Sequence, residues 1–422
     1  MSRGGRDGLK KPVLAGLLAA ALLGFARPAT AQTPPSPGSK PEVLEALDPY
    51  TKGEAKALER AGYLTLAPVE WAEGIRADAV KETLGGIEIL WVETPHFKIG
   101  STLETYKSLS DPKEEDKVEA ELVRLKKKLA RFKDPHNKFD PWMRLHLYAQ
   151  RLEDAYAAFT TAFGLTAADF PEPGARGPEG DAKLGGGPYL GQQRKFTVLL
   201  LEKTSSLARF AKRYADREEH SWDRFPLPGG SIFLGVSAEG LRQFSYDLDA
   251  AMHALVACEI TKNFLGGFRE SNFTAPLWLE CGLGHAAARR VDERFAPAGM
   301  AAPSPSEPDA WKWEPRVRGL VENDVATPWK DMLAWNQFED LKVQGQLVAW
   351  SRASWLLSKP PAELRAFLIG ETEPLEDAAE GEALARARLE REQKAVEKAF
   401  GKKLEELDAE WSKHVKRRYA KS

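Results

Sequence analysis

The sequence predicts an α+β fold, in which a small mixed sheet with its helices is followed by a mainly helical C-terminal part. Three runs have the apolar pattern of strands, at 86–100, 194–201 and 230–236. Apolar residues at helical spacing lie between the first two runs and after the third, and the pattern is helical from residue 329 onward. Hydrophobic residues make up 43% of the 422 residues and aromatic residues 9%, which is ample for a buried core.

The individual elements follow in chain order. Residues 86–94 alternate apolar and polar side chains and 95–100 continue the extended pattern, as a strand pair would. The run at 194–201 is almost continuously apolar, which is typical of a strand buried on both faces. Helical spacing predicts helices at 116–132, 143–163, 205–214, 241–264, 274–290, 344–357, 361–368 and 384–418, the last interrupted by Gly401.

The N-terminus has the composition of a signal peptide. An apolar run at 13–25 is followed by the small-residue cleavage site Ala29-Thr30-Ala31. The basic residues before the run are Arg3, Arg6, Lys10 and Lys11. Removal of residues 1–31 predicts an exported protein, periplasmic or extracellular. The alternative is a membrane anchor, but the run is shorter than the roughly 20 residues of a spanning helix. No membrane span is expected in the mature protein.

Composition also divides the mature chain into segments. Residues 32–40 are rich in Pro and Ser and predict a disordered linker. The segments expected after it are an N-terminal helical segment at 41–84, the α+β core at 85–295, a loop at 296–324 and a helical C-terminal subdomain at 325–422. The formal net charge of -2 gives no electrostatic case for binding nucleic acid or an anionic membrane.

Residues 249–285 carry the candidate chemistry. A zinc-peptidase site of the H-E-x-x-H type needs two histidines one turn apart on a helix, a Glu between them as general base, and a third ligand from a following helix. At the corresponding place this chain has Asp249-Ala250-Ala251-Met252-His253, followed downstream by Trp278-Leu279-Glu280-Cys281-Gly282-Leu283-Gly284-His285. The pattern indicates the layout of a zinc site in which most reactive side chains are replaced.

This layout resembles the gluzincin metallopeptidases of the peptidase MA clan, in particular the secreted bacterial branch in which H-E-x-x-H is followed by W-L-x-E-G-L-A. Residues 278–284 fit the second motif, with Cys281 at the position of the ligand Glu. Residues 351–368 and 400–411 resemble later helices of the family. The resemblance implies a zincin-like fold with an active-site helix, and a cleft beside Trp278 and Glu280.

Two registers relate the first motif to the family. In the preferred register His253 is the second histidine, Asp249 replaces the first and Ala250 replaces the Glu. In the other, His253 is the first histidine, Ala254 replaces the Glu and Ala257 the second histidine. Both registers place an alanine where the general base belongs. Because loss of a positioned base costs roughly 10²- to 10⁴-fold in rate, we expect no ordinary peptidase activity.

The substituted positions also allow a remodelled metal site. Asp249 and His253 are i, i+4 on one expected helix, and Cys281 and His285 are i, i+4 on the next. If the helices meet as in gluzincins, these four side chains could surround a zinc ion. The alternative is that His253 is a packed core histidine and that no cofactor is bound. Cys281 could also join Cys258 in a disulfide, because an exported chain meets an oxidising compartment, and a thiol held in this way is no ligand.

Three hypotheses of function follow from these observations. The leading one is an exported, catalytically inactive metallopeptidase-like protein, a pseudopeptidase, that acts by binding a peptide or protein partner. The second is a zinc-dependent hydrolase that uses the remodelled Asp/His/Cys site. The third is a structural scaffold that docks other proteins through the charged C-terminal helices at 384–422.

Overall fold

The computed structural model describes residues 47–107, 112–170, 187–218, 220–243, 249–270, 275–294, 310–335, 338–373, 375 and 382–421. They belong to one compact unit, which runs from Leu44 to Ser422. The expected signal peptide and linker, and the start of the N-terminal segment, lie outside the described residues. Among the helices that the structure describes, none is long and apolar enough to cross a membrane.

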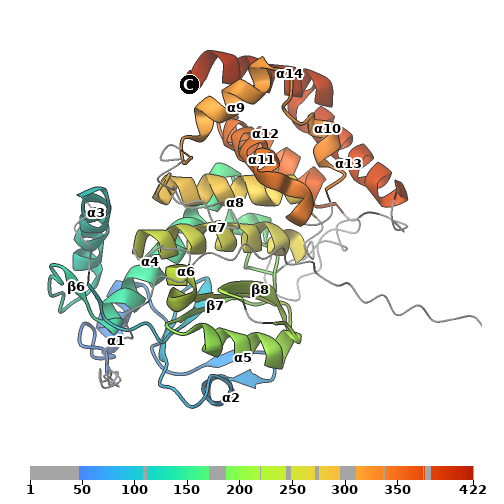
Figure 1. Ribbon diagram of the computed structural model, residues 1–422. Coiled ribbons are helices and arrows are strands. Elements are labelled where there is room, and N and C mark those ends of the chain that lie inside the picture. Colours follow the sequence, from blue (N-terminus) through green and yellow to red (C-terminus); the bar gives the residue numbers. More distant parts are fainter. Residues whose placement is uncertain are drawn as a thin grey trace, which may run out of the picture. The chain divides into compact units, whose positions relative to one another are not determined.

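A five-stranded mixed sheet forms the centre of the α+β part (Figure 1). From one edge to the other, its strands are β3 (Leu90–Glu93), β4 (Phe97–Ser101), β7 (Phe196–Leu201), β9 (Ser231–Ser237) and β8 (Trp222–Leu227). The three central strands are parallel, and both edge strands run antiparallel to their neighbours. The strands expected within 86–100, 194–201 and 230–236 are confirmed, whereas β8 lies in a region where the sequence predicted none.

Helices cover both faces of this sheet, which explains why the side chains of β7 and β9 are buried on both faces. Successive side chains of β7 point to opposite faces, so that Val198 joins the larger hydrophobic core and Leu199 the smaller one. The helices on the side of Leu199 are α2 (Ala77–Thr83) and α5 (Thr204–Ala215). Those on the side of Val198 are α4 (Pro141–Ala162) and α7 (Asp249–Gly267).

Two further parts of the chain differ from the prediction. For the helix expected at 241–264, the structure describes α6 (Ala238–Gln243), which begins before residue 241, and α7, which extends beyond residue 264, whereas residues 244–248 lie outside the described residues. The loop expected at 296–324 contains the helix α9 (Trp313–Glu322). Three residues of α9 at i, i+4 and i+8 are buried: Trp313, Val317 and Val321. A helix this short is stabilised mainly by such packing, and local sequence signals predict it poorly.

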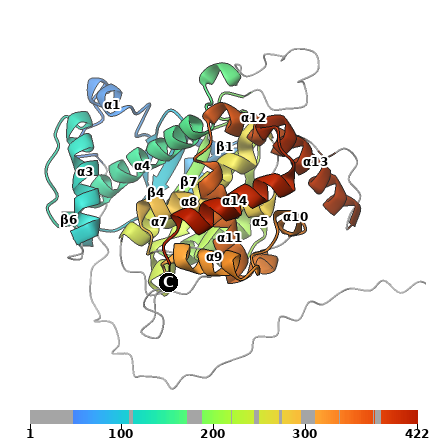
Figure 2. The same ribbon diagram turned by 90° about the horizontal axis from the view of Figure 1, so that it is seen from above.

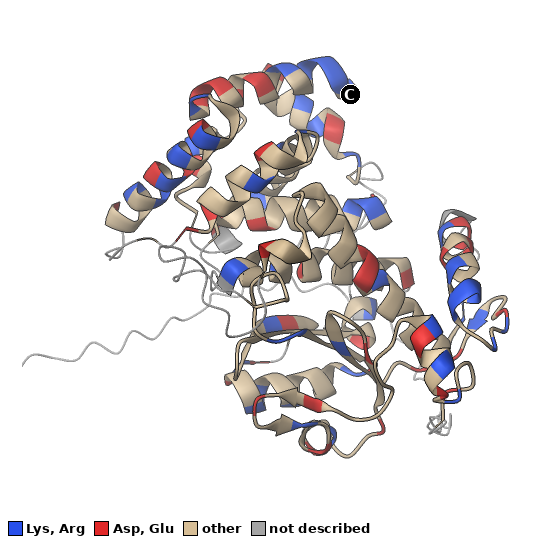
Figure 3. Ribbon diagram, turned by 180° about the vertical axis from the view of Figure 1, so that it is seen from behind, with Lys and Arg blue, Asp and Glu red and all other residues tan. Residues whose placement is uncertain are grey.

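The C-terminal part is helical, as the sequence predicts (Figure 2). Its helices are α10 (Trp329–Met332), α11 (Lys342–Leu356), α12 (Pro361–Glu371), α13 (Glu382–Phe400) and α14 (Leu404–Arg418). The break between α13 and α14 falls at Gly401, whose φ of 62° is in the left-handed region that favours glycine. Acidic and basic side chains are interspersed along α13 (Figure 3).

The remaining elements are short, apart from one long helix. They are α1 (Ala55–Ala61), β1 (Glu70–Ala72), β2 (Ile75–Arg76), β5 (Tyr106–Lys107), α3 (Pro112–Lys128), β6 (Lys138–Phe139) and the 3-10 turns Ala167–Asp169, Phe268–Glu270 and Phe338–Leu341. The helices expected at 116–132 and 143–163 correspond to α3 and α4, with ends that differ by a few residues.

Helix α8 (Leu277–Val291) packs against both α7 and α11. Two of its glycines make this close approach possible. A Cβ on Gly282 would lie 2.5 Å from the carbonyl oxygen of Ala349 in α11, and a Cβ on Gly284 would lie 2.9 Å from Sγ of Cys258 in α7. The glycines therefore let the backbone of α8 lie against its neighbours, and this positions the residues of the candidate site.

Candidate functional site

Helix α7 carries most of the polar residues that the sequence singles out. It is buried along its length, and His253 is its only partly exposed residue. Two separate groups of polar side chains lie on it, one around its first two turns and one where it meets α8 and β8.

Asp249, the first residue of α7, is a counter-ion for arginines of α4. Its carboxylate accepts hydrogen bonds from Arg151 Nη1 at 2.6 Å and from Tyr148 Oη at 3.1 Å, and Arg144 Nη2 lies 3.5 Å away. Burial would raise the pKa of Asp249, but the two guanidinium groups outweigh it and lower the pKa to about 2. Asp249 is therefore an ionised carboxylate that is already paired.

His253 lies one turn further along, beside the pair formed by Glu121 of α3 and Arg151. Its Nδ1 is 3.9 Å from Glu121 Oε1, and Glu121 itself accepts from Arg151 Nη2 at 2.8 Å. Burial and the charge of Arg151 lower the pKa of His253 well below its ordinary value, and the attraction of Asp249 offsets this only in part. The imidazole is therefore neutral at neutral pH.

The second group is a cluster of charges and thiols, here called the α7–α8 ion cluster. Its members are Arg224 of β8, Cys258, Glu259 and Lys262 of α7, and Glu280 and Cys281 of α8. Lys262 Nζ donates to Glu259 Oε1 at 2.7 Å, and Arg224 Nε lies 3.1 Å from Glu259 Oε2. Arg224 also forms an ion pair with Glu280. Two cations face two carboxylates, so the cluster is neutral as a whole.

The cluster keeps its charges although it is buried. The side chains of Glu259 and Lys262 are 3% and 7% exposed. Burial raises the pKa of Glu259, but Lys262 and Arg224 outweigh it and lower the pKa below its ordinary value. Burial lowers the pKa of Lys262, but the thiolate form of Cys258, the carboxylate of Glu259 and the thiolate form of Cys281 raise it above its ordinary value. Glu259 and Lys262 therefore form an ionised pair.

Both cysteines of the chain are free, buried thiols in this structure. Burial raises the pKa of Cys258 and of Cys281, so both thiols are protonated at neutral pH. A hydrogen bond from the Cys258 thiol contributes to the low pKa of Glu259. The two cysteines lie on facing helices in one cluster, as the predicted disulfide would require.

His285 lies one turn after Cys281 but is held by α11. Its Nε2 is 3.0 Å from Oε1 of Gln346, so the proton of the imidazole belongs on Nε2. Its ring meets the ring of Trp313 edge-on at 5.1 Å between centroids. Burial and the charge of Lys262 lower the pKa of His285 to about 3. This histidine is a neutral, hydrogen-bonded part of the core.

The structure does not bring the four expected zinc ligands together. Asp249 and Cys258 are nine residues apart on α7, which is roughly 13 Å along the helix axis, and Cys281 lies near Cys258. Within the described ranges, no three His, Cys, Asp or Glu side chains are grouped as a metal ion would require.

The motifs found in the sequence include neither Glu259 nor Lys262, the pair at the centre of the cluster. Cys258-Glu259-Ile260-Thr261-Lys262 has the i, i+1, i+4 spacing of H-E-x-x-H, with the Glu kept at its second position. Both registers that the sequence predicted for the motif instead use His253 as one of its two histidines. One sequence signal does point to this cluster. Glu259 stands between Cys258 and Lys262, on the helix that precedes the Trp278-Leu279 motif.

Neither residue expected to line a cleft faces open solvent. Trp278 is fully buried, meets Trp329 edge-on at 5.0 Å, and its Nε1 lies 3.5 Å from Oε2 of Glu392. Glu280 is 8% exposed and is held by Arg224. Trp278 therefore connects helices of the core, and Glu280 connects α8 to β8.

The outer edge of β8 is closed by residues of β8 and by Arg217. Pro226 has no N–H to donate. The N–H of Arg224 donates to Asp223 Oδ1 at 2.8 Å, and Arg217 Nη1 lies 3.4 Å from the carbonyl oxygen of Arg224. An extended peptide that adds to a sheet edge needs free backbone groups along the strand, and β8 offers few.

Comparison with protein-family models, with curated proteins and with solved structures finds no match for this chain. Its function therefore has to be inferred from the side chains that the fold brings together.

Proposed function

We propose that the chain is an exported, gluzincin-like protein whose zinc centre has become the α7–α8 ion cluster, and that it binds a peptide or protein partner instead of hydrolysing one. The observation that carries this proposal is the place of Lys262. In the C-E-x-x-K register its ammonium stands at the second histidine position and is ion-paired with Glu259 at 2.7 Å. The small mixed sheet, followed by α7 and α8, is compatible with the zincin-like fold that the resemblance implies.

The side chains of the cluster do not fit a zinc ion. In this register the ligand positions hold Cys258, Lys262 and Cys281. An ammonium has no lone pair to donate to a metal, and both thiols are protonated because they are buried. Lys262 and Arg224 already offset the two carboxylates, so a divalent cation would add uncompensated positive charge to a buried site. No hydrolytic step through a metal follows from these residues.

Glu259 is also unsuited to act as a general base. Such a base needs a pKa near the working pH and contact with the proton that it removes. Here Lys262 engages one carboxylate oxygen and Arg224 the other, and both lower the pKa of Glu259. The same contacts tie α7 to β8, and through Glu280 to α8. The cluster therefore acts as a structural junction.

The proposal is tested by rebuilding a zinc site in the mature protein. The triple variant Cys258→His, Lys262→His and Cys281→Glu restores H-E-x-x-H on α7 with a Glu on α8. We expect about one zinc per chain in this variant, measured by elemental analysis, and no stoichiometric zinc in the wild type. Hydrolysis of a mixed peptide substrate is measured on both, and the wild type should show none.

A matched control restores the same motif in the register anchored on His253. It combines Asp249→His, Ala250→Glu and Cys281→Glu, and we expect it to bind no stoichiometric zinc because its ligands are too far apart. Zinc in this control, with none in the first variant, would overturn the register. Stoichiometric zinc in the wild type that is lost on Cys281→Ser would favour the zinc hydrolase instead.

A further inference from the structure

The last turns of α14 carry a concentration of positive charge (Figure 3). Residues 411–421 contain no Asp or Glu, and their exposed basic residues, here called the α14 basic end, are Lys413, Lys416, Arg417, Arg418 and Lys421. Within the residues that the structure describes, none of these five side chains has an ion pair or a hydrogen bond. The nearest acid along the helix, Glu410, is paired with Lys402 at 2.8 Å. The charges of the basic end are therefore available to a partner.

The helix dipole accounts for only part of this charge. The C-terminus of a helix carries about half a negative charge, which favours cations in the last turn. The full charges of the basic end far exceed it, and their effect reaches His414. Burial lowers the pKa of His414, and the charges of Arg418, Arg417 and Lys359 lower it further. This end of the helix is therefore a site of positive potential.

The first half of α14 is acidic, which limits the extent of the basic end. The acidic residues are Glu405, Glu406, Asp408 and Glu410. From Lys413 to Arg418 the helix rises roughly 8 Å, and an extended chain advances about 3.3 Å per residue. The basic end, with Lys421, therefore faces a segment of about three or four residues. A longer polyanion that followed the helix would meet its acidic half.

The apolar face of α14 is not available to a membrane. A helix that lies on a membrane surface inserts its apolar face among the lipids, but the apolar residues of α14 are buried in the core: Leu404, Leu407, Trp411 and Val415. Within the described part of the chain, the exposed large hydrophobic side chains all lie outside α14. These observations favour a short acidic segment of a protein over a membrane surface.

A hollow of about 500 Å³ borders the basic end, between α8, α9 and α11. Ala420 lines it, and the ring of Tyr419 lies 6.1 Å from the ring of Trp350 in its wall. Its volume is within the roughly 300–1,000 Å³ that is typical of ligand pockets. Its other apolar lining residues are Ala286, Trp311, Trp313, Pro315 and Leu357. The hollow can therefore take an apolar side chain of a segment that lies on the basic end.

Arg289 adds a fixed positive charge to the wall of the hollow. Its guanidinium lies 4.2 Å from the ring centroid of Trp313 and 4.8 Å from that of Trp350. It donates to the backbone carbonyls of Glu293 at 2.7 Å and Trp311 at 3.0 Å. Burial lowers the pKa of Arg289 to about 10, so it stays charged at neutral pH. Counting all charged lining residues, the hollow does not repel an acidic segment, because they are Arg289, Arg290, Lys312, Glu293 and Glu314.

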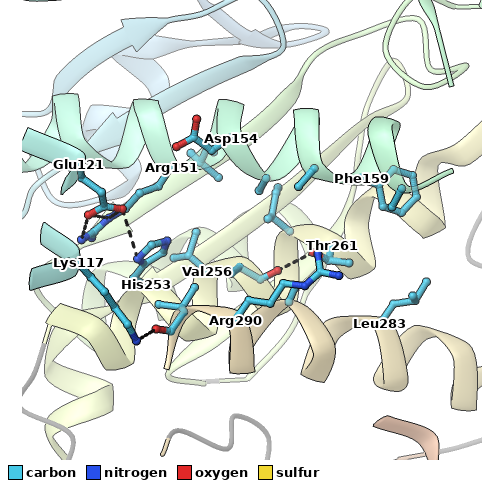
Figure 4. Close-up of a pocket in the computed structure, with 18 of the residues that line it drawn as sticks. Lys117, Glu121, Arg151, Asp154, Phe159, His253, Val256, Thr261, Leu283 and Arg290 are labelled. Atoms are coloured by element: carbon cyan, nitrogen blue, oxygen red, sulfur yellow. Dashed lines mark hydrogen bonds and ion pairs between the residues drawn. The ribbon is translucent and has the colours of Figure 1, made fainter. Parts of the chain in front are cut away.

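The cavity of about 370 Å³ between α3, α4, α7 and α8 differs, because its charges are largely paired (Figure 4). Arg151 is shared between Glu121 and Asp249. Lys117 donates to the backbone carbonyl of Val291 and lies 4.0 Å from Asp292. We therefore expect charge to guide a partner to the basic end of α14.

We propose that the α14 basic end and the hollow beside it bind an acidic, extended segment of a partner protein, in which Glu or Asp residues flank an apolar side chain. The acids pair with Lys416, Arg417 and their basic neighbours, and the apolar side chain enters the hollow beside Ala420. The inference rests on the proposed function, since it gives the chemistry of the partner. No residue of the α7–α8 ion cluster takes part, so peptide binding and the zinc measurements can fail independently.

The test is fluorescence anisotropy of dye-labelled peptides titrated with the mature protein at low salt. We expect Glu-Glu-Phe-Glu-Glu to bind, less tightly as NaCl is added. Glu-Glu-Ala-Glu-Glu should bind more weakly, and Lys-Lys-Phe-Lys-Lys should not bind. Combining Lys416→Gln with Arg417→Gln should weaken binding of the acidic peptides roughly 2- to 30-fold, as the loss of two exposed ion pairs would.

Two further variants test the location. Lys126→Gln with Lys127→Gln removes the same charge from exposed residues of α3 and should bind the peptides like the wild type. Ser354→Trp, at a half-buried position that lines the hollow, should weaken binding of the Phe peptide to the level of the Ala peptide. The same variant should bind the Ala peptide like the wild type, which shows that it is folded.

Several outcomes would overturn the proposal. They are no binding of the acidic peptides, equal binding of the basic peptide, or an equal loss of binding in the α3 control. Vesicles of phosphatidylglycerol and a single-stranded oligonucleotide are measured in parallel. Tighter binding of either one, weakened by Lys416→Gln with Arg417→Gln, would assign the basic end to a membrane or to nucleic acid instead.

Discussion

Replacing Arg224 by methionine should destabilise the protein by about 2–4 kcal/mol at neutral pH. Removing one partner of a buried ion pair costs roughly 3–5 kcal/mol, because the other charge stays buried without compensation. Arg224 pairs with Glu259, whose side chain is 3% exposed, and with Glu280, whose side chain is 11% exposed, but the side chain of Arg224 is itself 21% exposed. Water therefore reaches part of the site and relieves some of this cost, which moves the expected value to the lower part of the range.

The rescue of this variant distinguishes a charge effect from a loss of packing. Without Arg224, Lys262 alone would balance two carboxylates, so Glu280→Gln in the Arg224→Met background should recover a large part of the lost stability. Urea unfolding followed by tryptophan fluorescence and circular dichroism gives the free energies. Arg76→Met, which removes an exposed pair with Asp78, should cause no measurable change. A cost below about 1 kcal/mol, or no recovery with Glu280→Gln, would refute the role given to Arg224.

Three further predictions concern other parts of the fold. Burial raises the pKa of both carboxyls in the buried pair Glu371 and Glu392, and the charge of Glu392 raises the pKa of Glu371 further, so the native chain binds protons more tightly than the unfolded chain. This contribution to stability is present below about pH 4.5 and is lost as the pH rises through the native pKa values. Glu371→Gln should therefore raise Tm above that of the wild type by more at pH 8 than at pH 5. An equal gain in Tm at both pH values would contradict this prediction. Gly282→Ala should cost about 1–3 kcal/mol in urea unfolding, because its Cβ would lie 2.5 Å from the carbonyl oxygen of Ala349, whereas Gly319→Ala, with open space in a helix, should not destabilise. In reduced protein both cysteines should react with a thiol reagent at pH 8 only after unfolding, since both are buried and have raised pKa values. Fast reaction of the native protein would contradict this burial. A lack of free thiols in the exported protein would indicate a disulfide.

The regular elements that the sequence predicts are those whose pattern depends on local structure. The run at 194–201 is mostly apolar because helices cover both faces of β7. The spacing of the C-terminal helices likewise follows from one buried face per helix. The sequence did not predict the edge strand β8, because Arg224 and Pro226 interrupt its apolar pattern. Its strand conformation depends on pairing with β9.

The sequence alone determined the α+β class, the helical C-terminal part and the position of the helix that carries the candidate site, since these depend on hydrophobic periodicity along the chain. Only the tertiary structure decided which polar residues meet. Arg224, Glu259, Lys262 and Glu280 come from a strand and two helices, and their charges matter only because the fold buries them together. A search for histidines along the chain leads to His253, whereas contact between α7, α8 and β8 brings together Glu259 and Lys262 on another face of the same helix. Electrostatic pairing in a buried site depends on distances in space, and spacing along a single helix does not contain that information.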